Sequence, residues 1–293
     1  MAHPLTALVL SGGGARGAYQ VGVLRGLVEQ GFLRPDRPGI EVFVGSSAGA
    51  INATFLAAHA GELEAGLALL ERIWGTVTPS RVYRTDVASL GRLGVRWAWD
   101  LSFGGLTRDV QARSLLDTAP LRRLFDEELP FDRIEANVAA GSVAALALLA
   151  TDLRTSSGVV FLHAPPGTPT WARRRWRIER ARIGADHLMA SCAIPILFPP
   201  IQVGGCYFAD GSIRNTAPLS PAINLGAQRI IAIGVSSPPP AGEAAVSSEA
   251  PTVAQIAGVL LDAVMLDAIE VDVEHSERVN TSVVRFPGGD PGN

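Results

Sequence analysis

Short apolar runs alternate along the chain with longer stretches in which apolar residues recur every three or four positions. Residues 5–10 form an almost uninterrupted apolar run, which predicts a buried strand. Residues 17–30 carry apolar side chains on one helical face and are followed by Gly31, which predicts a helix and its C-cap. Because strands alternate with helices, we expect an α/β fold with a largely parallel sheet. The same patterns predict further strands at 40–44, 143–150, 159–163, 206–209, 229–235 and 281–286, and further helices at 47–60, 62–74, 120–127, 183–192 and 252–273.

Composition narrows this picture only slightly. The 293 residues are 47% hydrophobic, which is enough for a well-buried core, and the net charge of −3 provides no general attraction to nucleic acid or to an anionic surface. The two cysteines, Cys192 and Cys206, lie in apolar surroundings without metal-ligand spacing, so we expect a reducing compartment and no disulfide. The first residues lack a signal-peptide pattern, and no apolar run approaches the roughly 18 residues of a membrane span. We therefore expect a cytoplasmic protein.

A glycine motif follows the first predicted strand. Gly12, Gly14 and Gly17 have the spacing that cradles a dinucleotide pyrophosphate, yet the second strand ends in Val44 and Gly45, where such a site needs an acidic residue. A phosphate-binding P-loop is disfavoured as well, because the chain contains no lysine to follow Gly17. What remains is a glycine-rich turn at a helix N-terminus, whose backbone N–H groups can bind an anion, including the oxyanion of a reaction. A dinucleotide-binding oxidoreductase is the alternative interpretation.

A second motif stands where the acidic residue is missing. Gly45, Ser47 and Gly49 form a G-x-S-x-G pattern between a predicted strand and a predicted helix, which is the context of a nucleophile elbow. The glycines allow strand and helix to approach closely, and the turn lifts the serine hydroxyl off the sheet edge. A tight structural turn is the alternative. The nucleophile interpretation makes Ser47 the attacking residue and predicts an oxyanion hole from backbone N–H groups of Gly12, Gly13, Gly14 and Ala48.

A serine nucleophile needs a proton acceptor. Among the five histidines only His275 falls late enough to follow a candidate acid, and it lies in a charged stretch typical of a solvated helix end. Only one predicted strand precedes the elbow strand, whereas an α/β-hydrolase has several, so a histidine-based triad is poorly supported. Asp210 is the better candidate, because it ends a short apolar strand and precedes Gly211 at a tight turn. An ordinary Asp-Gly turn is the alternative there.

Four stretches of the chain resemble the patatin-like acyl hydrolases, also called patatin-like phospholipases, and occur in the family's order. They are GGGARG at 12–17, GSSAG at 45–49, ASCAIPILFPPI at 190–201 and DGS at 210–212. The resemblance covers residues 5–235 and implies a single-domain, three-layer sandwich with a central sheet flanked by helices. It also implies a Ser-Asp dyad of Ser47 and Asp210, an oxyanion hole in the first loop, and hydrolysis of lipid acyl esters without a metal or a cofactor.

Two residues beside these motifs bear on the dyad. The family usually has Gly or Ala where Ser212 stands, and a hydrogen bond from the Ser212 hydroxyl to Asp210 would change the pKa of that carboxyl. A basic residue is common in the family at the place of Arg16, which we expect either to position the loop or a phosphate, or to have a purely structural part. After the matched region we expect a Pro/Ser/Ala-rich linker at 236–251, and a C-terminal helix and strand packed on the core at 252–293.

Two other segments suggest surface functions. Residues 170–182 combine two tryptophans with six arginines, which is typical of peripheral contact with anionic lipid headgroups, and a solvated strand-and-loop face is the alternative. Residues 93–106 suit either an apolar flap over the site or a packed core segment. We expect a lipid or phospholipid ester as the binding partner and no nucleic acid, because the net charge is negative and no nucleic-acid motif is present. A non-catalytic lipid-binding module is a second alternative, and the sequence leaves the oligomeric state open.

Overall fold

One mixed sheet contains the strands in the part of the chain that the structure describes. The computed structural model describes residues 3–33, 39–84, 114–171, 176–214 and 218–235, with a few residues between 252 and 278. The strands are β1 (Thr6–Leu10), β2 (Val42–Ser46), β3 (Ala145–Asp152), β4 (Ser157–His163), β5 (Trp176–Arg180), β6 (Ile201–Val203), β7 (Cys206–Asp210) and β8 (Arg229–Ile233). Their order is β5-β4-β3-β2-β1-β8, and β7 pairs with both β3 and β6. Strands β1, β2, β3 and β8 run parallel, whereas β4 and β7 run antiparallel to β3.

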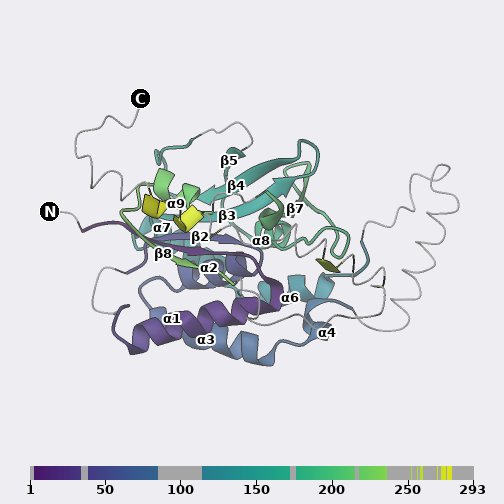
Figure 1. Cartoon of the computed structure of the whole chain (residues 1–293), viewed down its shortest axis with the longest axis horizontal. Helices are drawn as coiled ribbons and strands as arrows, with labels where there is room; N and C mark the ends of the chain where they lie inside the picture. The colour runs from purple at the N-terminus through teal and green to yellow at the C-terminus, as the bar shows by residue number, and fades with distance from the viewer. Residues whose placement is uncertain are drawn as a thin grey trace, which may run out of the picture.

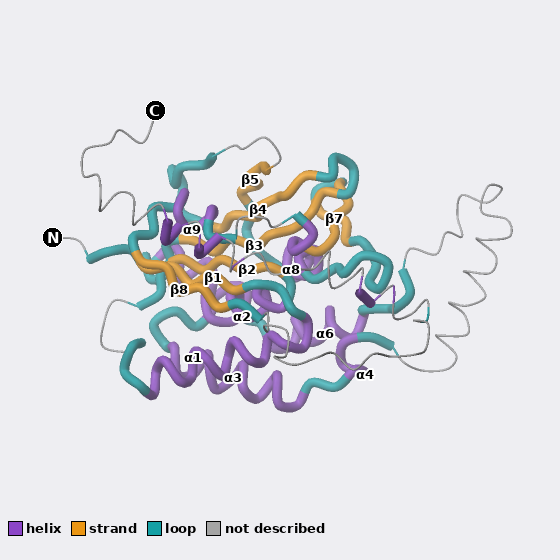
Figure 2. The backbone as a smooth tube through the Cα atoms, in the orientation of Figure 1, coloured by secondary structure: helices purple, strands orange, loops and turns teal. Residues whose placement is uncertain are grey.

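Helices cover both faces of this sheet (Figure 1). They are α1 (Gly17–Glu29), α2 (Ala48–Ala58), α3 (Leu63–Thr76), α4 (Pro79–Val82), α6 (Ala119–Glu128), α7 (Phe131–Ala139), α8 (Ala185–Ser191) and α9 (Ser220–Asn224). Figure 2 shows the strands as a central layer, with α1 and α3 on one side and α9 on the other. The predicted α/β sandwich with a mostly parallel central sheet is confirmed.

Alternate residues of the central strands supply two separate hydrophobic clusters. Leu8 and Leu10 of β1 pack into a cluster with side chains of α1, α2, α3 and α6, whereas Ala7 and Val9 pack on the other face with residues of α9. Both faces of β1 are therefore buried. This double burial explains why the strand has an almost continuous apolar run instead of an alternating pattern.

The predicted strands and helices between residues 5 and 235 agree with the observed ones within two residues at each end. The patterns do not predict β6, α4, α7 or α9, and they allow β5 only as part of a solvated strand-and-loop face. The predicted flap at 93–106, the linker at 236–251 and the strand at 281–286 lie outside the described residues.

The C-terminal region is described only in places. Ile269 is buried in the cluster that contains α9, and the Asp272 carboxylate accepts a hydrogen bond of 2.8 Å from the backbone N–H of Leu219. These contacts place part of the predicted C-terminal helix against the sheet. The division of the chain into a core, a linker and a C-terminal segment stays a prediction.

The sheet brings the ends of two strands together along β3. Strand β4 pairs with β3 from Leu146 to Asp152, so β2 and β7 share the opposite edge of β3. The pairing of β2 ends at Leu149, opposite Ser46, and the pairing of β7 ends at Ala150, opposite Asp210. Two strands that run in opposite directions thus end at adjacent residues of a third, and their next residues emerge at one place.

Candidate active site

Ser47 occupies a strained turn between β2 and α2. Its backbone has φ 52° and ψ −125°, a conformation that L-residues rarely adopt and that costs on the order of 1–3 kcal/mol. The flanking glycines are required by space: a Cβ on Gly45 would lie 2.4 Å from the Gly49 carbonyl oxygen, and one on Gly49 would lie 2.2 Å from the Leu10 carbonyl oxygen. The G-x-S-x-G stretch therefore has the strand–turn–helix geometry that its spacing predicts.

Asp210 ends β7 and is fully buried. Its Oδ1 accepts a hydrogen bond of 2.9 Å from the backbone N–H of Ser212, and its backbone carbonyl accepts one of 2.9 Å from the Thr151 hydroxyl. The other carboxyl oxygen, Oδ2, is buried and has no hydrogen-bond partner among the described residues. A carboxylate oxygen in this state has a lone pair available for a proton.

The surroundings of Asp210 raise its pKa to about 6. Burial is the dominant cause, because it penalises the charged form. The backbone N–H of Ser212, the Ser47 hydroxyl and the Ser212 hydroxyl act in the opposite direction and limit the rise in this pKa. The Ser47 hydroxyl therefore lies near enough to stabilise the carboxylate, although its geometry falls short of a full hydrogen bond to Oδ2.

The glycine loop lies directly against these two residues. A Cβ on Gly12 would lie 2.2 Å from the Ser212 Oγ and 3.1 Å from the Ser47 Cβ, so a larger residue there would displace the Ser212 side chain and crowd Ser47. Gly13 is packed against Val235, and Gly14 has φ +56°, which favours glycine. Among the described residues, no acceptor meets the backbone N–H groups of Gly13 and Gly14. These groups are free to meet an anion beside Ser47.

Arg16 closes the same loop. Its side chain is exposed, and its Nε donates a hydrogen bond of 3.4 Å to the Gly13 carbonyl oxygen, while its backbone N–H bonds the same oxygen at 3.1 Å. Both contacts lie within the turn of the loop, and the expected part of Arg16 in positioning the loop or a phosphate stays a prediction.

An apolar cavity of about 470 Å³ adjoins Ser47. This volume lies within the range of small-molecule sites, roughly 300–1,000 Å³. Gly14 and Ala48 border the cavity next to the serine, so the predicted nucleophile and two predicted oxyanion-hole residues face one space. Most of the remaining lining is aliphatic or aromatic and comes from α2, α3, α4, α6 and two loops: Ile51, Phe55, Ile73, Trp74, Val77, Val82, Tyr83, Leu116, Leu121, Leu124, Phe125, Ile194, Leu197 and Phe198.

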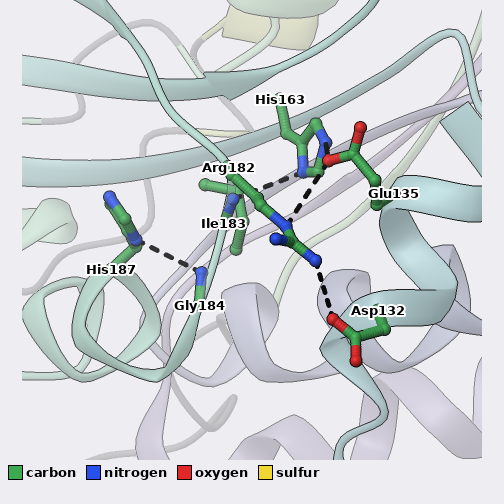
Figure 3. A network of polar contacts seen from close by, with 7 residues as sticks. All are labelled: Asp132, Glu135, His163, Arg182, Ile183, Gly184 and His187. Carbon is green, nitrogen blue, oxygen red and sulfur yellow. Dashed lines mark hydrogen bonds and ion pairs between the residues drawn. The ribbon is translucent and has the colours of Figure 1, made fainter.

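The described histidines have other partners. Figure 3 shows His163 between Glu135, whose Oε2 lies 3.1 Å from Nε2, and the Ile183 N–H, which donates to Nδ1 at 3.3 Å. His187 accepts a hydrogen bond of 3.2 Å from the Gly184 N–H. Burial lowers the pKa of both imidazoles, which favours their neutral forms. No described histidine lines the cavity, and His275 lies outside the described residues.

The arginine- and tryptophan-rich segment is engaged within the chain. Trp176 covers Gly158, where a Cβ would lie 2.6 Å from the indole. Arg177 pairs with Asp152 at 2.5 Å, and Arg180 donates to backbone carbonyls. Figure 3 shows Arg182 paired with Asp132 at 2.7 Å. Residues 172–175 lie outside the described part. The arginines that the structure does describe thus have internal partners, and contact with a lipid surface through this segment stays a prediction.

The fold and site together define an α/β protein with a serine on a strained turn between a strand and a helix. The chain belongs to the patatin-like phospholipase family, whose model matches residues 8–223. This membership supports a lipid hydrolase function and leaves the oxidoreductase alternative without support.

Two solved structures are similar to this chain. One is VipD from Legionella pneumophila, with a TM-score of 0.41 and 18% identity over 72% of this chain and 46% of that one. The other is ExoU from Pseudomonas aeruginosa, solved in complex with SpcU, with a TM-score of 0.35 and 20% identity over 67% of this chain and 39% of that one. The chain thus spans less than half the length of these two proteins.

The described ranges contain neither a metal site nor a membrane span. There, no group of three or more His, Cys, Asp or Glu side chains is arranged to hold a metal ion. In the same ranges no helix is long and apolar enough to cross a bilayer. Cys192 and Cys206 are free thiols.

Two features of the site were not predicted from the sequence. The cavity is built by helices that are distant in sequence, so no local pattern shows it. Ser191 lies in the matched stretch 190–201 without a predicted role, yet its hydroxyl accepts a hydrogen bond from the backbone N–H of Ser47. Its position inside a matched motif was the available signal.

Proposed function

We propose that this chain hydrolyses carboxylic esters of lipids, with Ser47 as the nucleophile and Asp210 as the general base. The proposal rests on the arrangement of Ser47, the cavity and Asp210. A strained serine borders an apolar cavity and adjoins a buried carboxyl, one oxygen of which has no hydrogen-bond partner among the described residues. Strain and unsatisfied polar groups of this kind persist where the surrounding fold holds them for function.

The reaction follows from these positions. Ser47 Oγ attacks the ester carbonyl carbon while Asp210 accepts the hydroxyl proton, and the carbonyl oxygen becomes an oxyanion. The intermediate collapses with release of the alcohol, whose oxygen takes the proton from Asp210, and leaves the acyl group on Ser47. A water molecule then attacks the acyl carbon and gives its proton to Asp210. The fatty acid departs as Ser47 regains that proton.

The raised pKa of Asp210 suits the role of general base. A carboxyl with a pKa of about 6 is ionised at neutral pH and is a stronger base than an ordinary aspartate, whose pKa is about 3.9. Direct transfer between Asp210 and Ser47 also needs no histidine relay.

The glycine loop is proposed as the oxyanion hole. The N–H groups of Gly13 and Gly14 are available, and those of Gly12 and Ala48 are the other candidate donors next to Ser47. Removing one such donor typically lowers kcat by about 10²–10³. Arg16 is assigned the part of positioning this loop through the Gly13 carbonyl.

The cavity is proposed to hold the acyl chain. Its lining offers few polar groups, so it suits an alkyl chain and leaves the polar part of the lipid near Ser47 and outside the cavity. A phospholipid, a lysophospholipid and a simple fatty ester all meet this description. Contact with a membrane surface and a cytoplasmic location stay predictions.

Labelling with a fluorophosphonate probe, followed by peptide mapping, tests the proposal. The probe should modify Ser47, and Ser47→Ala should abolish both labelling and ester turnover with little change in melting temperature. Ser46→Ala is the matched control, because Ser46 is the adjacent buried serine and precedes the elbow. A folded wild-type chain that does not react with the probe would instead favour a non-catalytic lipid-binding module.

A further inference from the structure

Three consecutive residues at the end of α8 contact both members of the proposed dyad. The Ser191 hydroxyl accepts a hydrogen bond of 3.2 Å from the backbone N–H of Ser47. The Cys192 thiol donates to the Ser47 carbonyl oxygen at 3.4 Å. The Ala193 carbonyl accepts a hydrogen bond of 2.9 Å from the Asp210 N–H. We call residues 191–193 the bridging segment, because it joins the nucleophile to the base.

Ser191 links this segment to the sheet through its side chain. The residue is fully buried, and its hydroxyl donates its proton to the Leu149 carbonyl oxygen at 2.6 Å. With the proton used there, a lone pair on Oγ remains for the Ser47 N–H. Leu149 is the β3 residue that pairs with Ser46, so this chain of hydrogen bonds fastens the elbow to the sheet immediately beyond its last paired residue.

The same carbonyl also lies against the base. A Cβ on Gly211 would lie 2.2 Å from the Leu149 oxygen, so the turn after Asp210 packs onto the atom that Ser191 holds. The Ser47 elbow, through Ser191, and the turn after Asp210 are therefore both positioned by the Leu149 carbonyl of β3. Ser191 reaches the elbow by a side-chain hydrogen bond, whereas Gly211 meets the Leu149 oxygen directly, so loss of the Ser191 hydroxyl would release the Ser47 N–H and leave the contact of Gly211 in place.

The Ser47 N–H has a particular need for this acceptor. Ser47 precedes the first turn of α2, whose initial N–H groups have no partner within the helix, and its backbone has left the β3 ladder. A buried N–H without an acceptor is costly, and a residue at φ 52° keeps its conformation only when its surroundings fix it. Burial raises the pKa of Cys192 well above its usual value, so the thiol keeps the proton with which it bonds the Ser47 carbonyl.

We propose that Ser191 is a positioning residue that orients the Ser47 elbow toward Asp210 through the backbone of the nucleophile. The proposal rests on the proposed nucleophilic role of Ser47. Because Ser191 is absent from the cavity lining, it acts on the rate of attack and leaves lipid binding unchanged.

The test compares Ser191→Ala with wild type in fluorophosphonate labelling of Ser47 and in hydrolysis of a para-nitrophenyl fatty ester. We expect labelling rate and kcat to fall on the order of 10²-fold, as for other displacements near 1 Å, with KM nearly unchanged. Thr54→Val is the matched control. It removes an equally buried hydroxyl on α2 that bonds the Ala50 carbonyl at 2.6 Å, and it should keep kcat within a few-fold.

Ser191→Cys gives a graded comparison that does not depend on the alanine variant folding. Sulfur is a weaker acceptor than oxygen, so its labelling rate should fall between those of wild type and Ser191→Ala. Folded Ser191→Ala or Ser191→Cys proteins that are labelled as fast as wild type would overturn the proposal. A loss confined to KM would do so as well. Wild-type chain without labelling at Ser47 would instead refute the nucleophile itself, so the two failures are distinguishable.

Discussion

Asp152 and Asp210 are fully buried carboxyls on paired strands, yet their surroundings move their pKa values in opposite directions. Burial raises the pKa of both. At Asp152 this is outweighed by Arg177, at 2.5 Å from Oδ2, and by the backbone N–H groups of Arg154 and Thr155, so that the pKa falls to about 2. At Asp210 the opposing groups are weaker, and the pKa rises to about 6.

The comparison separates a structural carboxylate from a proposed catalytic one. Burial is common to both, so burial by itself does not create a base. The difference is the countercharge: Asp152 has a guanidinium, whereas one oxygen of Asp210 has no partner among the described residues. The first arrangement keeps the Asp152 carboxylate charged at neutral and mildly acidic pH, whereas the second brings the pKa of Asp210 close to neutral pH.

The largest effect should come from Asp210→Asn. Asparagine keeps the shape of the side chain but cannot accept the Ser47 proton, so kcat should fall on the order of 10³-fold. The melting temperature should stay the same or rise, because a costly buried charge is removed. Ester hydrolysis and thermal melting measure the two quantities. Substantial turnover by this variant would move the base elsewhere.

Asp152→Asn should show the reverse pattern. It leaves Arg177 without its buried partner and weakens the turn that Arg154 and Thr155 close, so the free energy of unfolding should fall by about 1.5–3 kcal/mol. The kcat of the folded protein should stay within a few-fold of wild type. Urea denaturation gives the stability. A loss of kcat as large as that of Asp210→Asn would remove the distinction between the two carboxyls.

Acidification should act on the two carboxyls in different pH windows. The folded-state pKa of Asp210 lies above the unfolded value of about 3.9, so the cost of its buried charge is present above pH 6 and is relieved as the pH falls toward 4. The value of kcat/KM should therefore fall below about pH 6, while any stability advantage of Asp210→Asn over wild type shrinks. The depressed pKa of Asp152 stabilises the fold above about pH 3.9, and this contribution is lost as the pH falls toward 2. A stability advantage that grows on acidification would contradict the raised pKa of Asp210.

The smallest effect should come from His275→Ala. If a carboxylate is the base, this histidine is dispensable and kcat should stay within a few-fold of wild type. A folded variant that loses on the order of 10³-fold in kcat would support a triad in place of the dyad.

The local parts of the site could be predicted because sterics impose them. Gly45 and Gly49 are required by contacts with the nearby backbone, and that requirement leaves a spacing that is visible in the sequence. Asp210 could be predicted as a site residue from the sequence for a similar reason, since it ends an apolar strand and is followed by Gly211 at a turn.

The other parts of the site depend on contacts between strands that are distant in sequence. No local sequence pattern predicts that β2 and β7 pair with the same edge of β3. None predicts that Arg177 of β5 pairs with Asp152. A signal for β5 did exist, because Trp176 and Ile178 alternate with charged residues, but the arginines favoured a surface interpretation. The contrast between the two carboxyls therefore became visible only with the sheet.

Trapping the acyl-enzyme tests the central claim most directly. A para-nitrophenyl fatty ester is mixed with the protein, the reaction is quenched in acid, and the peptides are mapped by mass spectrometry. The account predicts an acyl group on the peptide that contains Ser47, which is absent in Ser47→Ala and strongly reduced in Asp210→Asn. An acyl group on another residue, or undiminished turnover by folded Ser47→Ala, would contradict it.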